Sequence, residues 1–278
     1  MLKHILRQLQ TGQSLSIDES QAAFQMVFDG APECQIAALL SLLSAKGEAG
    51  EEVAGLAQVM RDAMVKIDAS GPLLDIVGTG GDSANTVNLS TGSALLTASC
   101  GVRVAKHGNR SVSSRCGSAD VLEALGIPIH SEPAAVEQVI NHHGFGFIYA
   151  PHFHPLMARL GEIRRDLGFR TCLNLVGPLL NPARAEYLVV GVYAPHVVPL
   201  MTEALTLLGM KRAFVFHGTG TDEITAMGPA TGYLIEKDKA VPFTVDPQDY
   251  GIEPCTLQQL QGGDSKLNAS ILRRALAG

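Results

Sequence analysis

The stretch DIVGTGGDSANTVNLSTGSALLTASCGVRVAKHGNRSVSSRCGSADVLEALG, residues 75–126, carries most of the chemistry in this chain. An apolar run at 73–77 breaks into GTGGD at 78–82, as a buried strand does where it opens into a loop. Glycines leave backbone N–H groups accessible, and a helix predicted to begin at Leu89 directs its positive end to the same point. The stretch therefore favours a phosphate-binding loop.

A second loop adds positive charge next to the first. KHGNR at 106–110 follows another short apolar run, 102–105, and the residues at 111–118 are rich in serine. Taken separately, GTGGD is also typical of an ordinary turn, and KHGNR of a solvated basic turn. GTGGD matches neither the dinucleotide pattern GxGxxG nor the phosphate loop GxxxxGKS/T. A solvated turn needs no hydroxyl lining, so the two loops together favour an anion site.

The composition is that of an ordinary globular protein. Of 278 residues, 46% are hydrophobic and 17% are charged, which is ample material for a core. A formal net charge of -6 argues against a general nucleic-acid or bilayer surface and fits a small anionic ligand. Five cysteines without a CxxC pair suggest neither a zinc site nor a disulfide framework. With no leader and no membrane-length apolar run, we expect a cytoplasmic protein without a membrane partner.

Residues 2–64 have a helical pattern. Apolar residues recur at helical spacing, Ser16 and Glu19 match a capping box, and glycines at 12, 30 and 47 are placed to end helices. Four short helices with tight loops predict a bundle, whose apolar positions we assign to its core or to a subunit contact. SGP at 70–72 then marks a hinge.

Beyond the hinge, strands and helices alternate. This order is typical of a parallel sheet with helical crossovers, in which both glycine-rich loops follow the carboxyl ends of strands, where α/β sheets bind ligands. The predicted strands are 73–77, 102–105, 145–150, 187–193 and 212–217, and helices are predicted to begin at Leu89, Ser118 and Pro133. Further predictions are a helix at 154–167 that continues through 170–175, a helix at 199–208, a β-hairpin of 232–236 and 240–245, and a helix at 265–277.

Several motifs resemble the anthranilate phosphoribosyltransferases, the enzymes of tryptophan biosynthesis. They are GTGGD at 78–82, NLST at 88–91 and KHGNRSVSSRCGSADVLEALG at 106–126, joined by RRDLGFRTCLNLVGPLLNP at 164–182 and GTDEI at 220–224. The resemblance covers nearly the whole chain. Arg115, Cys116 and Leu180 differ from many relatives, and the chain stops at Gly278 where relatives continue through further helices.

The resemblance implies an α/β fold with two domains. A small amino-terminal helical domain, 1–70, is joined by helices within 154–182. A larger α/β domain, 71–278, has a mostly parallel central sheet of the nucleoside phosphorylase/phosphoribosyltransferase type and lacks its carboxyl-terminal helices. We expect a homodimer formed through the helical domain.

The implied reaction transfers the phosphoribosyl group of 5-phosphoribosyl 1-diphosphate to anthranilate and releases diphosphate. A loose, oxocarbenium-like transition state mainly requires positioning and electrostatics, so no covalent nucleophile is expected. Lys106, His107 and Asn109 are assigned to positioning, with a structural role preferred for His107. The implied donor-binding residues are Gly78, Gly81, Asp82, Thr86, Asn88, Leu89, Ser90, Thr91, Lys106, His107, Gly108, Asn109, Arg110, Ser113, Ser114 and Ser118.

The acceptor and metal residues also come from the resemblance. Anthranilate is assigned to Gly78, Asn109 and Arg164, and two Mg²⁺ ions per subunit to Ser90, Asp222 and Glu223. By themselves, two acids in a loop are usually solvated. Arg164 and Arg165 point about 100 degrees apart on a helix, so only one of them can face a given ligand.

Two other functions stay open from the sequence. A pyrimidine nucleoside phosphorylase-like enzyme has a similar architecture but uses inorganic phosphate and a nucleoside. A non-catalytic relative that binds nucleic acid through a basic surface is the second alternative, and the net charge of -6 argues against it.

Overall fold

A computed structural model describes residues 2–111, 115–130 and 132–278. Two predicted donor-binding residues, Ser113 and Ser114, lie outside the described residues. No described helix is both long and apolar enough to cross a membrane.

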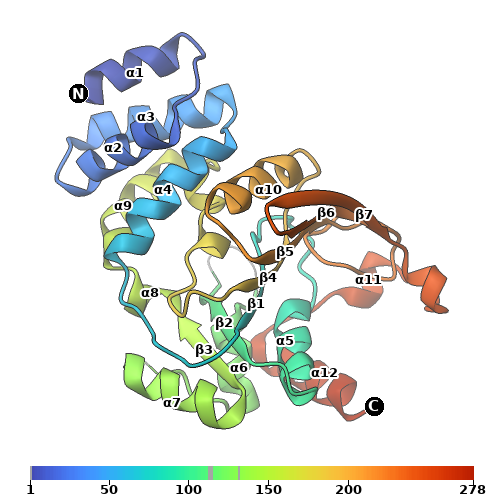
Figure 1. Ribbon diagram of the computed structural model, residues 1–278. Helices are drawn as coiled ribbons and strands as arrows, with labels where there is room; N and C mark the ends of the chain where they lie inside the picture. The colour runs from blue at the N-terminus through green and yellow to red at the C-terminus, as the bar shows by residue number, and fades with distance from the viewer. Residues whose placement is uncertain (1, 112–114, 131) are drawn as a thin grey trace.

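The amino-terminal helices form the predicted bundle, drawn in blue in Figure 1. They are α1 (Leu2–Gln10), α2 (Ile17–Phe28), α3 (Glu33–Lys46) and α4 (Gly50–Ala63). The capping box that starts α2 is present, because Glu19 N–H donates to Ser16 Oγ at 3.3 Å and Ser16 N–H donates to Glu19 Oε2 at 2.9 Å. α9 (Pro155–Leu167) packs against α3 and α4, far from it in sequence. The division at residue 70 stays a prediction.

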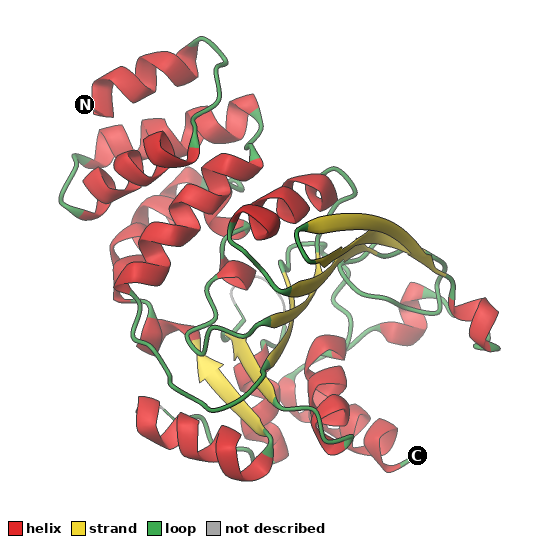
Figure 2. Cartoon of the chain, viewed as in Figure 1, coloured by secondary structure: helices red, strands yellow, loops and turns green. Residues whose placement is uncertain are grey.

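The strands that follow the helical bundle form one seven-stranded sheet in the order β3-β2-β1-β4-β5-β6-β7. Its parallel members are β1 (Leu74–Gly78), β2 (Val104–Gly108), β3 (Phe145–Tyr149), β4 (Tyr187–Gly191) and β5 (Arg212–His217). β6 (Ala230–Glu236) and β7 (Lys239–Val245) are antiparallel. The mostly parallel α/β architecture is therefore confirmed. Figure 2 shows the strands in yellow, flanked by red helices, with the helical bundle at the upper left.

Helices cover the two faces of the sheet. Their bounds are α5 (Leu89–Ser99), α6 (Ser118–Leu125), α7 (Pro133–His143), α8 (Ala150–Phe153), α10 (Val197–Leu207), α11 (Leu257–Leu260) and α12 (Ser265–Ala277). α5 packs on β1, β2 and β3, whereas α10 packs on β5, β6 and β7 and also contacts α4. One continuous core therefore joins the bundle to the α10 side of the sheet.

One predicted helix is wrong. The helical pattern does not continue through 170–175, because Gly168 ends α9 in the left-handed region with φ +67. The chain then passes through extended Thr171 into a short 3₁₀ turn, η1 (Cys172–Asn174), and a second, η2 (Gly177–Leu179). The break releases the segment after α9 from the helix axis and lets it approach the glycine-rich loop.

Candidate active site

The parallel strands bring the predicted loops to one edge of the sheet. β1 ends at Gly78 and β4 at Gly191, which are partners in the register, and both lie against the loop after β5 that carries Asp222. A Cβ on Gly78 would collide with the Asp222 carboxylate, and one on Gly191 with the Asp222 carbonyl oxygen. Glycine is therefore required at both positions for this close approach.

Hydrogen bonds tie the glycine-rich loop to the acidic pair. Gly80 N–H donates to Asp222 Oδ2 at 2.7 Å, and Asp222 N–H lies 3.4 Å from Asp82 Oδ2. Burial raises the pKa of Asp222 to about 7, and negative charge on Asp82 adds to the rise. Burial also raises the pKa of Glu223 to about 8, helped by Asp222. The two acids are held in the site and are not solvated loop residues.

Lys106 lies beneath these acids, nearly fully buried. Its ammonium donates to Ile76 O at 2.6 Å and reaches Ser90 Oγ at 3.4 Å. Burial lowers the pKa of Lys106, while negative charge on Asp75 and Glu223 opposes that change. Ser90 N–H donates to Glu223, which joins the start of α5 to the acidic pair. One buried ammonium thus sits between the glycine-rich loop, α5 and the acids.

The start of α5 supplies the next group of predicted donor-binding residues. Asn88 is the N-terminal cap and Leu89 begins the helix. Thr91 Oγ1 is buried and has no hydrogen-bond partner among the described residues. Thr86 lies just before the helix and forms an isolated antiparallel bridge with Gln261 near the end of the chain.

His107 faces the opposite side of β2, toward a buried polar network. His107 N–H donates to Asp75 Oδ1 at 3.1 Å, and Asn181 Nδ2 donates to Asp75 Oδ2 at 2.7 Å. The Nε2 atoms of His107 and His154 are 3.1 Å apart, so one of them must donate to the other. Burial lowers the pKa of His107 to about 3 and that of His154 to about 4. Both rings are therefore neutral near pH 7, which fits the structural role preferred for His107.

The rest of the KHGNR loop is fixed by α6. Arg110 pairs with Asp120 at 2.9 Å and with Glu123 at 2.7 Å, so its charge is balanced within the protein. Ser118 Oγ donates to Asn109 O at 3.1 Å. Gly108 leaves the space that Ser118 Oγ and the Phe147 ring occupy. Arg110 therefore acts on the loop through α6 rather than as a free cation.

Arg164 and Arg170 have different surroundings. Arg164 is half-buried on α9, which lowers its pKa, and it has no hydrogen bond or ion pair with another described residue. Its neighbour Arg165 is exposed. Arg170 reaches the glycine-rich loop, where its guanidinium donates to Gly81 O and lies 4.2 Å from the centre of the Tyr193 ring. The end of α9 and the glycine-rich loop are thus in direct contact.

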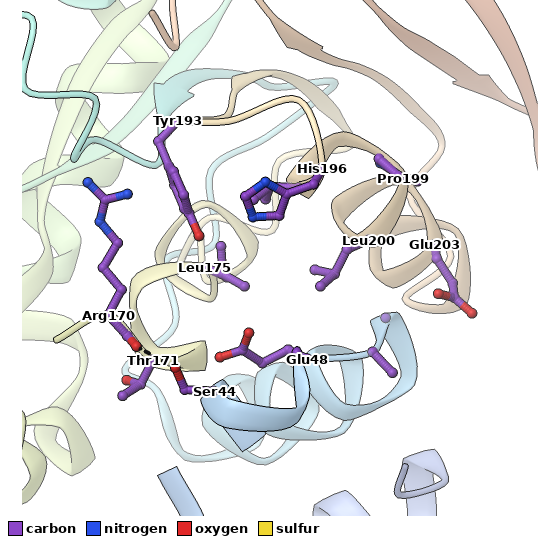
Figure 3. A pocket seen from close by; sticks show the side chains of 14 residues that line it. Ser44, Glu48, Arg170, Thr171, Leu175, Tyr193, His196, Pro199, Leu200 and Glu203 are labelled. Carbon is purple, nitrogen blue, oxygen red and sulfur yellow. Dashed lines mark hydrogen bonds between the residues drawn. The ribbon is translucent and has the colours of Figure 1, made fainter. Parts of the chain in front are cut away.

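A cavity of about 430 Å³ lies behind this contact, between the α3–α4 turn and α10 (Figure 3). Glu48 and Glu203 line it together with Tyr193 and His196. Burial raises the pKa of Glu48. None of the predicted site residues lines this cavity, and its two carboxylates oppose an anionic ligand. It adjoins the glycine-rich loop through Arg170 and Tyr193, which line it and bond to Gly81 and Thr79.

Sequence reasoning missed four residues of the site region. Asp75, Asn181 and His154 form the buried network under KHGNR, and Arg170 anchors the glycine-rich loop. Asp75 carried a readable signal, because a charged residue inside an apolar strand is rarely buried without partners. The pairing of Asn181 and His154 with that strand depends on tertiary structure.

Comparison with known families gives the same architecture. A family model described as "Glycosyl transferase family, helical bundle domain" matches residues 3–64, and one described as "Glycosyl transferase family, a/b domain" matches residues 70–278. Together they cover nearly the whole chain.

Named relatives are similar over the full length of the chain. Anthranilate phosphoribosyltransferase of Chlamydia felis is 44% identical over 279 residues, covering 100% of this chain and 81% of that protein. The Haloarcula marismortui enzyme is 45% identical over 279 residues, covering 100% of this chain and 84% of that protein.

Solved structures agree. The crystal structure of the Thermus thermophilus enzyme has a TM-score of 0.89 at 41% identity, covering 97% of this chain and 81% of that one. The Saccharomyces cerevisiae enzyme in complex with PRPP and Mg has a TM-score of 0.88 at 27% identity, covering 99% of this chain and 80% of that one. The chain belongs to the anthranilate phosphoribosyltransferase family.

Proposed function

We propose that the protein transfers the phosphoribosyl group of 5-phosphoribosyl 1-diphosphate (PRPP) to anthranilate, giving N-(5-phosphoribosyl)anthranilate and diphosphate in L-tryptophan biosynthesis. The observation that carries the proposal is the meeting of four segments at one sheet edge. They are the glycine-rich loop 78–82, the start of α5, the buried ammonium of Lys106 and the pair Asp222–Glu223. Backbone N–H groups and an ammonium suit a diphosphate, and paired carboxylates suit a metal ion.

The donor is held by the glycine-rich loop, α5 and the loop after β2. Gly78 and Gly81 allow close backbone approach, Asp82 anchors the loop, and the hydroxyls of Ser90 and Thr91 stand at the helix start. Thr91 Oγ1 has no partner among the described residues, so it is available to a ligand oxygen. The further donor-binding positions that we propose are Thr86, Asn88, Leu89, Lys106, His107, Gly108, Asn109, Arg110, Ser113, Ser114 and Ser118.

Anthranilate is assigned to Gly78, Asn109 and Arg164. Arg164 lies on the helix whose carboxyl end approaches the glycine-rich loop through Arg170. Its guanidinium is partly withdrawn from water and has no carboxylate partner among the described residues. A planar guanidinium fork suits the planar carboxylate of anthranilate.

Asp222, Glu223 and Ser90 fit Mg²⁺. Both carboxylates have pKa values raised by burial and by neighbouring negative charge, which is the field that a divalent cation neutralises. The described residues contain no group of three or more side chains able to hold a metal ion by themselves. Mg²⁺ usually binds one or two carboxylates and completes its shell with water and substrate phosphates. We propose two ions per subunit, which neutralise the diphosphate.

The protein contributes position and charge rather than a covalent intermediate. As the bond from the ribose to the diphosphate loosens, Lys106 stabilises the negative charge that develops on the leaving group. Asn109 and Arg164 hold anthranilate at the opposite side of the ribose, so that its amine attacks as the diphosphate leaves. His107 is neutral and keeps the loop in place.

One experiment compares the proposed transferase activity with the alternative, a pyrimidine nucleoside phosphorylase activity. The protein is incubated either with anthranilate, PRPP and Mg²⁺ or with a pyrimidine nucleoside and inorganic phosphate, and products are identified by mass spectrometry. We expect N-(5-phosphoribosyl)anthranilate only in the first mixture. Base release in the second mixture alone would support the phosphorylase. The named relatives favour the transferase.

Assembly and location extend the proposal. A homodimer through α1–α4 and α9 is checked by analytical ultracentrifugation, with a mass of twice 29.4 kDa expected. The cytoplasmic location stays a prediction.

A further inference from the structure

The end of the chain supports the donor-binding loop from its outer side. Val87 N–H donates to Leu260 O at 2.9 Å, and Gly262 N–H donates to Asn85 O at 3.0 Å. These bonds join 85–87 to a segment about 175 residues later, which we call the C-terminal strap, residues 255–268. In Figure 1, α11 and α12 carry this segment past the start of α5.

The strap also reaches the acidic loop. Cys255 N–H donates to Ala226 O at 3.0 Å, three residues after Glu223. One continuous piece of backbone therefore spans the two loops to which the diphosphate and its metal are assigned.

Asn268 forms the innermost contact of the strap. It is 1% exposed, and its side-chain amide bonds to Asn88, to Gly263 and to the side chain of Cys116. Asn268 Nδ2 donates to Asn88 Oδ1 at 2.9 Å, and Asn268 Oδ1 accepts from Gly263 N–H at 2.7 Å. Asn88 Nδ2 donates in turn to Cys116 O at 3.0 Å. The chain of bonds runs from the strap through the cap of α5 to the backbone just before α6.

The role of Asn88 is unusual for a cap residue. Asparagine at this position normally accepts a bond from an N–H group in the first turn of its own helix. The Asn88 side chain makes no such bond and is held between Asn268 and Cys116. Its amide thus aligns two helix starts, those of α5 and α6, which face the donor site.

Packing of α12 is provided by other residues. Leu272 fills the space that a Cβ on Gly92 would need, and Ala269 lies in the same apolar cluster. Arg273 donates to the carbonyls of Ala124 and Leu125 at 3.2 and 3.3 Å, at the far end of α6. The amide of Asn268 contributes hydrogen bonds, which fix the orientation of its partners, and does not bury apolar surface.

We propose that Asn268 is a positioning residue for the phosphoribosyl donor, acting through Asn88 on the starts of α5 and α6. This inference rests on the proposed function, because the donor is the ligand that these helix starts hold. It assigns the last helix of the chain to the donor site and not only to the core.

The test measures binding of PRPP with Mg²⁺ by isothermal titration calorimetry in the absence of anthranilate. Asn268→Ala removes the bonds to Asn88, Gly263 and Cys116, whereas Asn268→Asp keeps the acceptor for Gly263 N–H and loses the amide donor. We expect each variant to raise the dissociation constant of the donor about tenfold, which corresponds to one lost directional contact. Arg273→Ala is the matched control on the same helix, and it should leave the constant within about twofold of wild type.

The same bonds predict a split in the steady-state constants. Asn268→Asp should raise KM for PRPP about tenfold and change KM for anthranilate by less than about twofold, because only donor binding depends on the two helix starts. A general loss of fold would lower activity without this split. Circular dichroism at the assay temperature identifies variants that are folded. If Asn268→Ala is not folded, Asn268→Asp is used for the test.

A double-mutant cycle tests the route through Asn88. In an Asn88→Ala background, Asn268→Ala should change the donor constant by less than about twofold, because its partner is already gone. The inference would be overturned if the effects of the two substitutions on the dissociation constant of PRPP were additive. It would also be overturned if a folded Asn268→Asp protein bound PRPP with the wild-type dissociation constant. If the wild-type chain itself does not bind PRPP, the proposed function is wrong. If the wild-type chain binds PRPP and the variants bind it equally well, only this inference is wrong.

Discussion

Asp75 is a buried carboxylate whose partners all belong to the region of the donor site. It accepts from His107 N–H and from Asn181 Nδ2, and it lies close enough to Lys106 to shift that ammonium's pKa. Burial nevertheless raises the pKa of Asp75 from 3.8 to about 6. Ionised Asp75 on β1 therefore lowers the stability of the folded protein near pH 7, while its hydrogen bonds fix the position of the backbone at His107.

This cost makes Asp75→Asn a test of stability against pH. A raised acid pKa means that the folded protein binds a proton that the unfolded chain has released, so wild-type stability falls as the pH rises from about 4 to 6. Relative to the variant, the wild type should lose about 3 kcal/mol across this window, from the shift between 3.8 and about 6. Urea unfolding at pH 4 and pH 7 measures the difference. A difference that does not change with pH contradicts the assignment.

The acidic pair gives the second prediction at this scale. Asp222→Asn with Glu223→Gln removes the carboxylates to which we assign the metal, so we expect turnover to fall at least about a hundredfold while the fold is kept. Steady-state rates at limiting Mg²⁺ are the measurement. Glu203→Gln, which changes a carboxylate of the cavity beside α10, is the control. An unchanged rate in the double variant would make both acids ordinary loop residues.

Arg164 gives the third prediction for a single residue. Arg164→Ala should raise KM for anthranilate at least about tenfold and that for PRPP by far less, because the contact that we propose for it is to anthranilate alone. Arg165→Ala, one position along the same helix and exposed, should change neither constant appreciably. Equal effects of Arg164→Ala on both substrates would place this guanidinium elsewhere.

Single residues differed in how far the sequence could predict them. The prediction that Asp222 and Glu223 follow a strand is confirmed, because the apolar run before them is unambiguous. The burial of Lys106, the His107–His154 pair and the ion pairs of Arg110 were not predicted. Each depends on a partner from another element, and residue spacing along one segment carries no information about such partners.

Elements were predicted well where local signals agree. The hairpin of β6 and β7 closes through Lys237 and Asp238, both at positive φ, a two-residue turn that matches the twist of the strands. The strand after α5 was placed at 102–105, but β2 occupies Val104–Gly108. It extends through Lys106 because polar side chains at the end of a strand can be buried by neighbours, which apolar periodicity does not reveal.

Two glycines, one inside helix α9 and one directly after its last residue, have opposite predicted effects. Gly161 is inside the helix and a Cβ there meets nothing within 4 Å, whereas Gly168 ends the helix at φ +67. Gly161→Ala should stabilise the protein by about 0.5 to 1 kcal/mol, because it reduces backbone freedom in the unfolded chain. Gly168→Ala should destabilise it by about 1 kcal/mol, because alanine is strained in the left-handed region.

Chemical denaturation of the two variants measures both effects. The helix assignment is wrong if the order is reversed, since only the position relative to the end of α9 separates the two glycines.

At the scale of the whole molecule, the sheet has an apolar opening at the end opposite the active site. A cavity of about 580 Å³ is lined by residues from the starts of β1, β4 and β5, among them Leu74, Val189 and Phe214. Val102, which also lines this cavity, is 44% exposed. The chain spans 81% of the length of the Chlamydia felis relative, so that relative has additional residues.

The proposed activity depends on anthranilate being the acceptor. The most direct measurement is the fluorescence of anthranilate after addition of PRPP and Mg²⁺ to the wild-type protein. We predict a loss of fluorescence that requires both additions and that is slowed by Asp222→Asn with Glu223→Gln. Unchanged fluorescence with a folded wild-type protein, whatever divalent metal is supplied, would contradict the proposed activity.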